Sequence, residues 1–184
     1  RLEDTTTVHR VAPIFHHSFP TSFGELTITW NTMGLIEGIY LPEKKPVELP
    51  SPKEPDLVIR RLSYQLVNFL KGENIKFQLE ILNWDRCTSF QRRVLETEYN
   101  IPRGYVSTYG RIASHIGLMG GARAVGNALA GNPFPLVIPC HRAVRTDGTL
   151  GGYQGGIYMK RKLLEMEGVE FDGSKVKMNK LYYY

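Results

Sequence analysis

One segment sets the arrangement of the whole chain: Gly131-Asn132-Pro133-Phe134-Pro135-Leu136-Val137-Ile138-Pro139-Cys140-His141-Arg142-Ala143-Val144. Its apolar run predicts a buried strand or extended segment, and Pro139 stops any helix from running into Cys140. Cys140 is therefore expected at the end of a rigid buried piece, next to two cationic side chains. Nearby positive charge lowers the pKa of a thiol, so the segment predicts a reactive cysteine. The alternative is a small buried hydrophobic residue beside a surface His-Arg pair, because free cysteines are usually buried and inert.

Length and composition are those of an ordinary globular protein. The 184 residues are 42% hydrophobic and 22% charged, which suits one large domain or two small ones. No apolar run approaches the roughly 20 residues that cross a bilayer. The first residues carry no apolar signal segment. We therefore expect no membrane partner.

Basic residues concentrate in the second half of the chain. Residues 1–84 hold 9 Lys+Arg and 10 Asp+Glu, whereas residues 85–184 hold 14 and 8. A basic half favours a polyanionic partner, nucleic acid first. The alternative is a mildly basic solvated surface.

The cysteine and histidine pattern argues against a disulfide scaffold and against a metal site. Cys87 and Cys140 are the only cysteines, and they form no Cys-x-x-Cys pair. We interpret Cys87 as structural and expect a reducing location, the cytoplasm or, in a eukaryote, the nucleus. His16-His17 is the only histidine pair, and adjacent strand residues face opposite ways, so it is a poor metal site.

The first half of the chain predicts a small α/β or α+β domain that supports the second half. Three segments alternate between apolar and polar residues in the way of antiparallel strands. They are residues 15–19, 24–30 and 34–41, with a hairpin turn at 31–34. A proline-rich loop follows over 42–55. A helix is then expected over 57–71 and a further strand over 77–82.

From residue 85 the pattern becomes helical. Helices are expected over 89–99, 109–116, 122–130 and 158–166. The second and third are joined by a glycine-containing turn and describe a helix-turn-helix. Small residues build the third helix, which suits either tight packing on the core or close approach to DNA. The tail over 169–184 reads as a short strand or as disordered.

Three residues can form an activated nucleophile. Cys140, His141 and Glu167, at the end of the last helix, suit the roles of nucleophile, base and orienting group. Side chains of adjacent residues diverge in extended chain, so a bridging water would relay the proton. Glu167 would fix the imidazole tautomer. The alternative for Glu167 is a solvated helix end.

Several blocks together resemble the O6-alkylguanine-DNA alkyltransferase family. They are Pro139-Cys140-His141-Arg142, Gly131-Asn132-Pro133 before it and Gly151-Gly152-Tyr153 after it, within a match from about Ser89 to Gly168. The resemblance implies an α/β (α+β) fold: a ribonuclease-H-like N-terminal domain over 1–84 and a helical, winged-helix-like, helix-turn-helix domain over 85–184. It implies a monomeric enzyme that uses no cofactor and no metal.

The resemblance also implies a reaction. The alkyl group, a methyl in the simplest case, would pass from O6-alkylguanine in double-stranded DNA to Cys140, once per molecule, with O4-alkylthymine as a second candidate. The enzyme would work from the minor groove, whose base pattern is degenerate. It would flip the damaged base out of the stack, at a cost of a few kcal/mol. Phosphate contacts would make binding weaken with salt.

Individual roles follow from the same resemblance. His141, a water and Glu167 would generate the thiolate of Cys140. Asn132 would brace the active-site turn, and Tyr109 would donate a proton to the leaving guanine. Arg123 would fill the gap left in the base stack. The remaining implied DNA-binding residues are Ala122, Ala124, Gly126, Thr146 and Gln91, and the implied pocket residues are Ala143, Gln154, Tyr153, Leu129 and Pro135.

One departure from the family and three rival functions remain. Gln154 stands where a smaller residue is common in the family, which would change the bulky groups that enter the pocket. Related alkyltransferase-like proteins bind such lesions without repair and typically have Trp at the Cys position, so Cys140 argues against that class. The rivals are a non-catalytic alkylated-DNA-binding module, a thiol hydrolase using Cys140 and His141, and a dimeric helix-turn-helix regulator.

Overall fold

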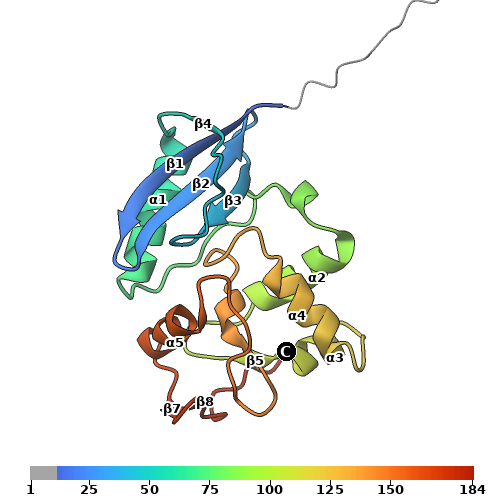
Figure 1. Ribbon diagram of the computed structural model, residues 1–184. Coiled ribbons are helices and arrows are strands. Elements are labelled where there is room, and N and C mark those ends of the chain that lie inside the picture. The colour runs from blue at the N-terminus through green and yellow to red at the C-terminus, as the bar shows by residue number, and fades with distance from the viewer. Residues whose placement is uncertain (1–11) are drawn as a thin grey trace, which may run out of the picture.

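The structure is a computed structural model that describes residues 12–184. Its first half is a four-stranded sheet covered by one helix (Figure 1). The elements are β1 (Ile14–Thr21), β2 (Gly24–Asn31), β3 (Ile36–Tyr40), β4 (Ser51–Pro52) and α1 (Leu57–Leu70). The strand order is β3-β2-β1-β4, with β1, β2 and β3 antiparallel and β4 parallel to β1. The three expected strands are confirmed; residues 9–11, where the alternation begins, lie outside the described part.

Local sequence explains the ends of these elements. The side chain of Asn31 accepts hydrogen bonds from the backbone N–H groups of Met33 and Leu35, and Gly34 takes the positive φ that closes the expected hairpin turn. Asp56 caps α1 by accepting from the N–H of Ile59. The β2–β3 hairpin and the helix therefore begin and end close to where the pattern predicts.

The second half is helical with short strand pairs. Its elements are η1 (Trp84–Arg86), α2 (Ser89–Tyr99), β5 (Ser107–Thr108), α3 (Tyr109–His115), α4 (Ala122–Ala130), η2 (Cys140–Arg142), β6 (Ala143–Val144), α5 (Ile157–Met166), β7 (Phe171–Asp172) and β8 (Lys175–Val176). Thr88 caps α2 and Thr108 caps α3, each by accepting from a backbone N–H three residues on. All four expected helices are confirmed. Together the two halves make a mixed α/β architecture.

The strand expected over 77–82 is wrong, and so is the strand or extended segment expected over 134–138. Over 77–82 only Leu82 pairs with the sheet, in a single bridge to Ile36, because the ring of Phe77 turns into the core against Phe69. Residues 134–138 form a buried turn instead of a strand, with Leu136 at φ 73°. Prolines at 133, 135 and 139 remove the N–H donors that a strand ladder needs.

The tail over 169–184, expected as a short strand or as disordered, contains short strands. β7 and β8 form a small hairpin, and Leu181 then bridges to Val106. The chain ends beside α3 (Figure 1). The tail therefore becomes part of the surface formed by the helix pair α3 and α4.

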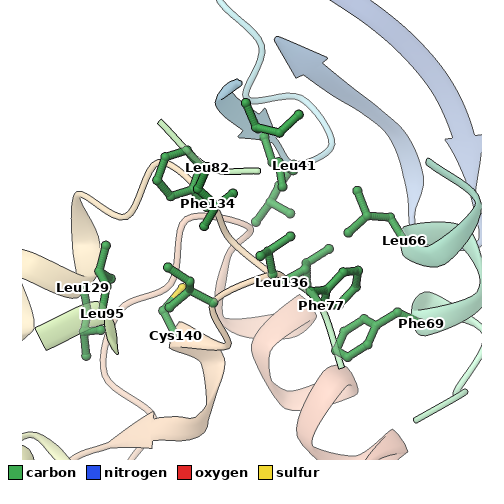
Figure 2. Close-up of a cluster of buried hydrophobic side chains, with 14 of the residues drawn as sticks. Leu41, Leu66, Phe69, Phe77, Leu82, Leu95, Leu129, Phe134, Leu136 and Cys140 are labelled. Atoms are coloured by element: carbon green, nitrogen blue, oxygen red, sulfur yellow. The ribbon is translucent and has the colours of Figure 1, made fainter. Parts of the chain in front are cut away.

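One hydrophobic core joins the two halves. Figure 2 shows Leu66 and Phe69 of α1 facing Leu136, with Leu95 and Leu129 on the other side of Cys140. Cys140 is 6% exposed and belongs to this core. The segment 131–144 is thus held between the sheet half and the helical half, as its apolar run predicts.

Two negative observations concern the described residues only. Between residues 12 and 184, no helix combines the length and the apolar character needed to cross a membrane. The same span holds no group of three or more His, Cys, Asp and Glu side chains that could bind a metal ion.

Candidate active site

Asn132 holds the turn that presents the cysteine. Its Nδ2 donates to the carbonyl oxygen of Ile138 at 3.1 Å, and its Oδ1 accepts from the N–H of Phe134 at 2.9 Å. The backbone groups of Ile138 and Phe134 are buried, so each hydrogen bond to Asn132 replaces one that water would otherwise make. Asn132 therefore links two main-chain groups of the turn that precedes Cys140.

His141 pairs with a buried carboxylate. Its Nε2 donates to Oε1 of Glu167, and both side chains are fully buried. Burial lowers the pKa of His141 below its ordinary 6.5, partly offset by Glu167, so the ring is neutral near pH 7. With Nε2 protonated, Nδ1 is the basic nitrogen, and it has no hydrogen-bond partner within residues 12–184.

Arg142 completes this buried group from the other side. Its Nε donates to Oε2 of Glu167 at 2.7 Å, and its Nη1 donates to the carbonyl of Ile101 at 2.7 Å. Burial would raise the pKa of Glu167, but His141 and Arg142 outweigh it and hold the pKa at about 2. Glu167 is therefore a carboxylate at any physiological pH, and the alternative of a solvated helix end is wrong.

The expectation that His141 and Arg142 lower the pKa of the Cys140 thiol is wrong. Their cationic and ring groups face Glu167, so the thiol loses water without gaining them as close partners. Burial raises the pKa of Cys140 to about 11 from an ordinary 9.0, although Asn132 and Lys160 act to lower it. The resting residue is a protonated thiol, and a base is needed to activate it.

We expect the intrinsic reactivity of Cys140 to rise steeply with pH. Only the thiolate reacts, so the rate of alkylation by iodoacetamide should climb about tenfold per pH unit between about pH 7 and pH 10. A Cys87→Ser variant isolates the signal of Cys140, and peptide mass mapping measures it. A plateau already reached near neutral pH would contradict a protonated resting thiol.

Lys160 of α5 is a cation whose charge acts to lower the pKa of the Cys140 thiol. It is fully buried, and its Nζ donates to the carbonyls of Ala143 at 2.7 Å, Gly152 at 3.2 Å and also Leu150. It reaches the hydroxyl of Tyr109 at 3.4 Å. Burial lowers the pKa of Lys160 to about 8. The ammonium group therefore ties the glycine-rich loop to the strand pair β5–β6.

Glu98 of α2 is a second buried carboxyl, and it lacks the partners that Glu167 has. It is 0% exposed, and neither carboxyl oxygen has a hydrogen-bond partner within residues 12–184. Burial raises its pKa well above 4.5, against the opposing effects of Lys160 and Arg142. A buried carboxyl whose oxygens lack hydrogen-bond partners costs stability.

Glu98→Leu is expected to stabilise the protein by about 1–3 kcal/mol near pH 8, because an unsatisfied buried polar group is removed. A carboxyl whose pKa is raised on folding destabilises increasingly as pH rises above its unfolded value of about 4.5. The gain should therefore shrink at low pH. Urea unfolding at about pH 4.5 and pH 8 measures it; a variant less stable than the parent at both would contradict this.

A cavity of about 670 Å³ opens onto Cys140. Its walls come from α3, α4 and the glycine-rich loop. Eight of the candidate residues line it: Cys140, Tyr109, Arg123, Ala122, Gly126, Leu129, Tyr153 and Gln154. Burial raises the pKa of Tyr109 to about 12, so its hydroxyl is a proton donor at neutral pH.

The other candidates lie outside this lining. Asn132, His141 and Glu167 are buried in contact with the cysteine turn, and Ala143 and Pro135 are also buried. Ala124 lies on α4, and Thr146 lines a neighbouring hollow. Gln91 donates through Nε2 to two main-chain carbonyls at the end of α4, at 3.1 and 2.9 Å. The roles of these residues in binding DNA or substrate stay predictions.

The glycine-rich loop is fitted closely to the site. Gly151 has φ 70°, and a Cβ there would lie 2.6 Å from the hydroxyl of Tyr109. Gln154 donates through Nε2 to the carbonyls of Ala130 at 3.0 Å and Asn132 at 2.7 Å. Its side chain therefore clamps the loop to the end of α4.

Sequence reasoning missed several residues of the site. The most important are Lys160 and Glu98, and the cavity lining adds Asn127, Ala130 and Arg145. The sequence could have predicted that Lys160 is buried, because apolar residues stand three and four positions after it, on the buried side of α5. The same signal was present for Glu98, because the apolar residues Val94 and Leu95 stand four and three positions before it on the buried side of α2.

The chain matches known proteins over most of its length. The family model described as "6-O-methylguanine DNA methyltransferase, DNA binding domain" matches residues 89–169. A methylated-DNA--protein-cysteine methyltransferase of Methanothermobacter thermautotrophicus is 42% identical over 149 residues, 81% of this chain and 82% of that protein. One of Methanosarcina acetivorans is 33% identical over 156 residues, 84% of this chain and 99% of that protein.

A solved structure agrees with these relatives. The crystal structure of Mycobacterium tuberculosis OGT in complex with DNA superposes with a TM-score of 0.73 at 34% identity, covering 83% of this chain and 92% of that one. Sequence, fold and the buried cysteine site therefore point the same way. The chain belongs to the family of methylated-DNA–protein-cysteine methyltransferases.

Proposed function

We propose that the protein repairs double-stranded DNA by moving the alkyl group of O6-alkylguanine to Cys140, with O4-alkylthymine as a second candidate lesion. The observation that carries this is Cys140 at the floor of an open cavity, with the buried His141–Glu167 pair next to it. The proposal includes a division at residues 84 and 85 into a ribonuclease-H-like supporting domain and a winged-helix-like catalytic domain. It also includes a monomer that acts once per molecule.

Activation of the thiol is the first step. Nδ1 of His141 is the free basic nitrogen, so it would take the proton of Cys140, through a water where the two side chains diverge. Glu167 remains a carboxylate and stabilises the imidazolium that forms, as its charge and its bond to Nε2 require. The high pKa of the resting thiol makes this base necessary.

Alkyl transfer follows. The sulfur attacks the alkyl carbon, the bond between that carbon and O6 breaks, and the electron pair leaves on guanine. Tyr109 would donate a proton to the ring as the charge develops, and the proton released by the thiol balances the one that guanine gains. The product is a thioether on Cys140. No other residue of the cavity is suited to remove it, so each molecule would react once.

DNA binding is proposed through α4 and the cavity rim. The small residues Ala122, Ala124 and Gly126 would let α4 approach the minor groove closely. A cavity of about 670 Å³ has room for a base rotated out of the stack. Arg123 is exposed at the rim and would occupy the space that the base leaves.

Arg123→Ala is expected to slow repair of duplex DNA by about 10- to 100-fold while affecting single-stranded substrate far less, because only the duplex needs help with unstacking. Transfer rates on matched single- and double-stranded oligonucleotides measure this. Arg60→Ala, an exposed arginine on α1, is the matched control. Equal losses on both substrates would show that Arg123 serves general DNA contact instead.

The proposed function is tested by incubating excess duplex carrying O6-methylguanine with the protein and quantifying the lesion. We expect loss of one lesion per protein molecule and then no further reaction. Binding of the lesion with no loss would favour the non-catalytic alkylated-DNA-binding module. If the protein neither binds the lesion nor removes it, the thiol hydrolase becomes the remaining candidate, and turnover of ester substrates would test it.

A further inference from the structure

A second hollow lies beside the candidate active-site cavity. It has a volume of about 720 Å³. Three stretches of chain line both spaces with neighbouring residues: 108–111, 120–123 and 145–146. The two hollows therefore open on the same face of the helix pair α3 and α4.

The chain tail forms one wall of this second hollow. The N–H of Tyr182 donates to the carbonyl of Val106 at 2.9 Å, and Nη2 of Arg111 donates to the carbonyl of Tyr182 at 3.0 Å. The ring of Tyr184 stacks on His115 with centroids 4.2 Å apart. These contacts fix the tail on α3, so its side chains are presented in a defined place.

The side chains that line the hollow suit a sugar phosphate. The guanidinium of Arg111 lies 4.8 Å from the ring centre of Tyr183, which is 75% exposed. Nε of Arg111 is buried and has no hydrogen-bond partner within residues 12–184. Thr108 and Thr146 also line this space, and no lining residue is acidic.

We propose that this hollow binds the DNA sugar–phosphate backbone that flanks the lesion, with Tyr182–Tyr184 as its wall. Phosphates follow each other every ~3.4 Å of helix axis on one strand. A strand that delivers a nucleotide to the Cys140 cavity therefore carries its neighbours across Arg111 and Tyr183. The inference rests on the proposed function, and it adds a contact that neither α4 nor the cavity supplies.

Charge substitutions at Tyr183 test this without disturbing the core, because that side chain is mostly exposed. Tyr183→Glu should weaken binding of O6-methylguanine duplex and Tyr183→Arg should tighten it, each by about three- to tenfold at low salt. Dissociation constants are measured over a salt series in a Cys140→Ala background. Tyr64→Glu and Tyr64→Arg, at an exposed tyrosine of α1, are the matched controls.

Single uncharged methylphosphonates placed around the lesion locate the contact. At one or two positions, neutralising the phosphate should abolish the difference between Tyr183→Glu and Tyr183→Arg. Equal affinity of both variants for every duplex would overturn the inference, as would a changed self-association with unchanged DNA binding. The protein with Cys140 is assayed for methyl transfer in parallel. Methyl transfer together with unchanged DNA affinity of the Tyr183 variants would contradict this inference alone. Absence of methyl transfer would contradict the proposed function.

Discussion

Glu167→Gln is expected to slow methyl transfer to Cys140 by about 10²–10⁴-fold, the range that a positioned general base contributes. The carboxylate holds Nε2 of His141 protonated and offsets the charge that the ring gains when Nδ1 takes a proton. A neutral amide can keep the shape of this contact but not the charge. The thiol, with a pKa of about 11, would then be left without an effective base.

Single-turnover rates on O6-methylguanine duplex measure this effect, with DNA affinity measured separately. Glu165→Gln, an exposed position on α5, is the matched control. Affinity should change little, because Glu167 is buried next to the turn and away from the cavity surface. A rate within about threefold of the parent would contradict the proposed role, since a general base is worth far more.

The same carboxylate also predicts a pH dependence of stability. Its pKa is about 2 in the folded chain and near 4.5 when unfolded, so its contribution is complete above about pH 4.5 and is lost as pH falls toward 2. Glu167→Gln should abolish this part of the acid sensitivity. It should also cost about 3–5 kcal/mol at neutral pH, since Arg142 loses a buried partner, so rates are compared well below the melting temperature.

Tyr109→Phe is expected to lower the transfer rate by about 10²–10³-fold, the usual effect of removing one hydrogen-bond donor to a developing negative charge. The phenol has a pKa of about 12 and lines the cavity that opens onto Cys140, so it is a donor at neutral pH. Phe keeps the ring and its packing. The loss should therefore fall on the chemical step and not on DNA affinity.

The effect of Tyr109→Phe is checked by measuring the transfer rate and the DNA affinity separately. Single-turnover rates at saturating duplex report the chemical step, and a salt-matched titration reports affinity. Tyr105→Phe, a partly exposed tyrosine outside the cavity, is the control. A loss confined to affinity would mean that Tyr109 positions DNA and does not protonate the leaving guanine.

Local sequence predicts much of this fold because local interactions decide it. Thr88 and Thr108 cap their helices, and Asn31 closes its turn, through bonds to residues at most four positions away. The strand expected over 77–82 fails because long-range packing of Phe77 overrides its alternation. The segment around Leu136 fails as a strand because its prolines cannot pair.

The sequence predicts that Cys140, His141 and Glu167 belong together, but it predicts neither the buried Lys160 and Glu98 nor the electrostatics of the site. The resemblance named Cys140, His141 and Glu167, and the structure places all three in or next to one buried turn. The direction of the thiol pKa shift depends on where neighbouring side chains point. Arg142 follows Cys140 closely in sequence yet faces Glu167, whereas Lys160, far along the chain, influences the thiol. Closeness in sequence therefore does not predict which cation acts on the Cys140 thiol.

Intact-protein mass after incubation with a duplex carrying one O6-methylguanine decides whether Cys140 is the acceptor. We predict a gain of one methyl group per molecule, capped at one in excess duplex, mapped to the peptide that holds Cys140 and absent in Cys140→Ala. An unchanged mass, or a methyl group that persists in Cys140→Ala, would contradict alkyl transfer to this cysteine.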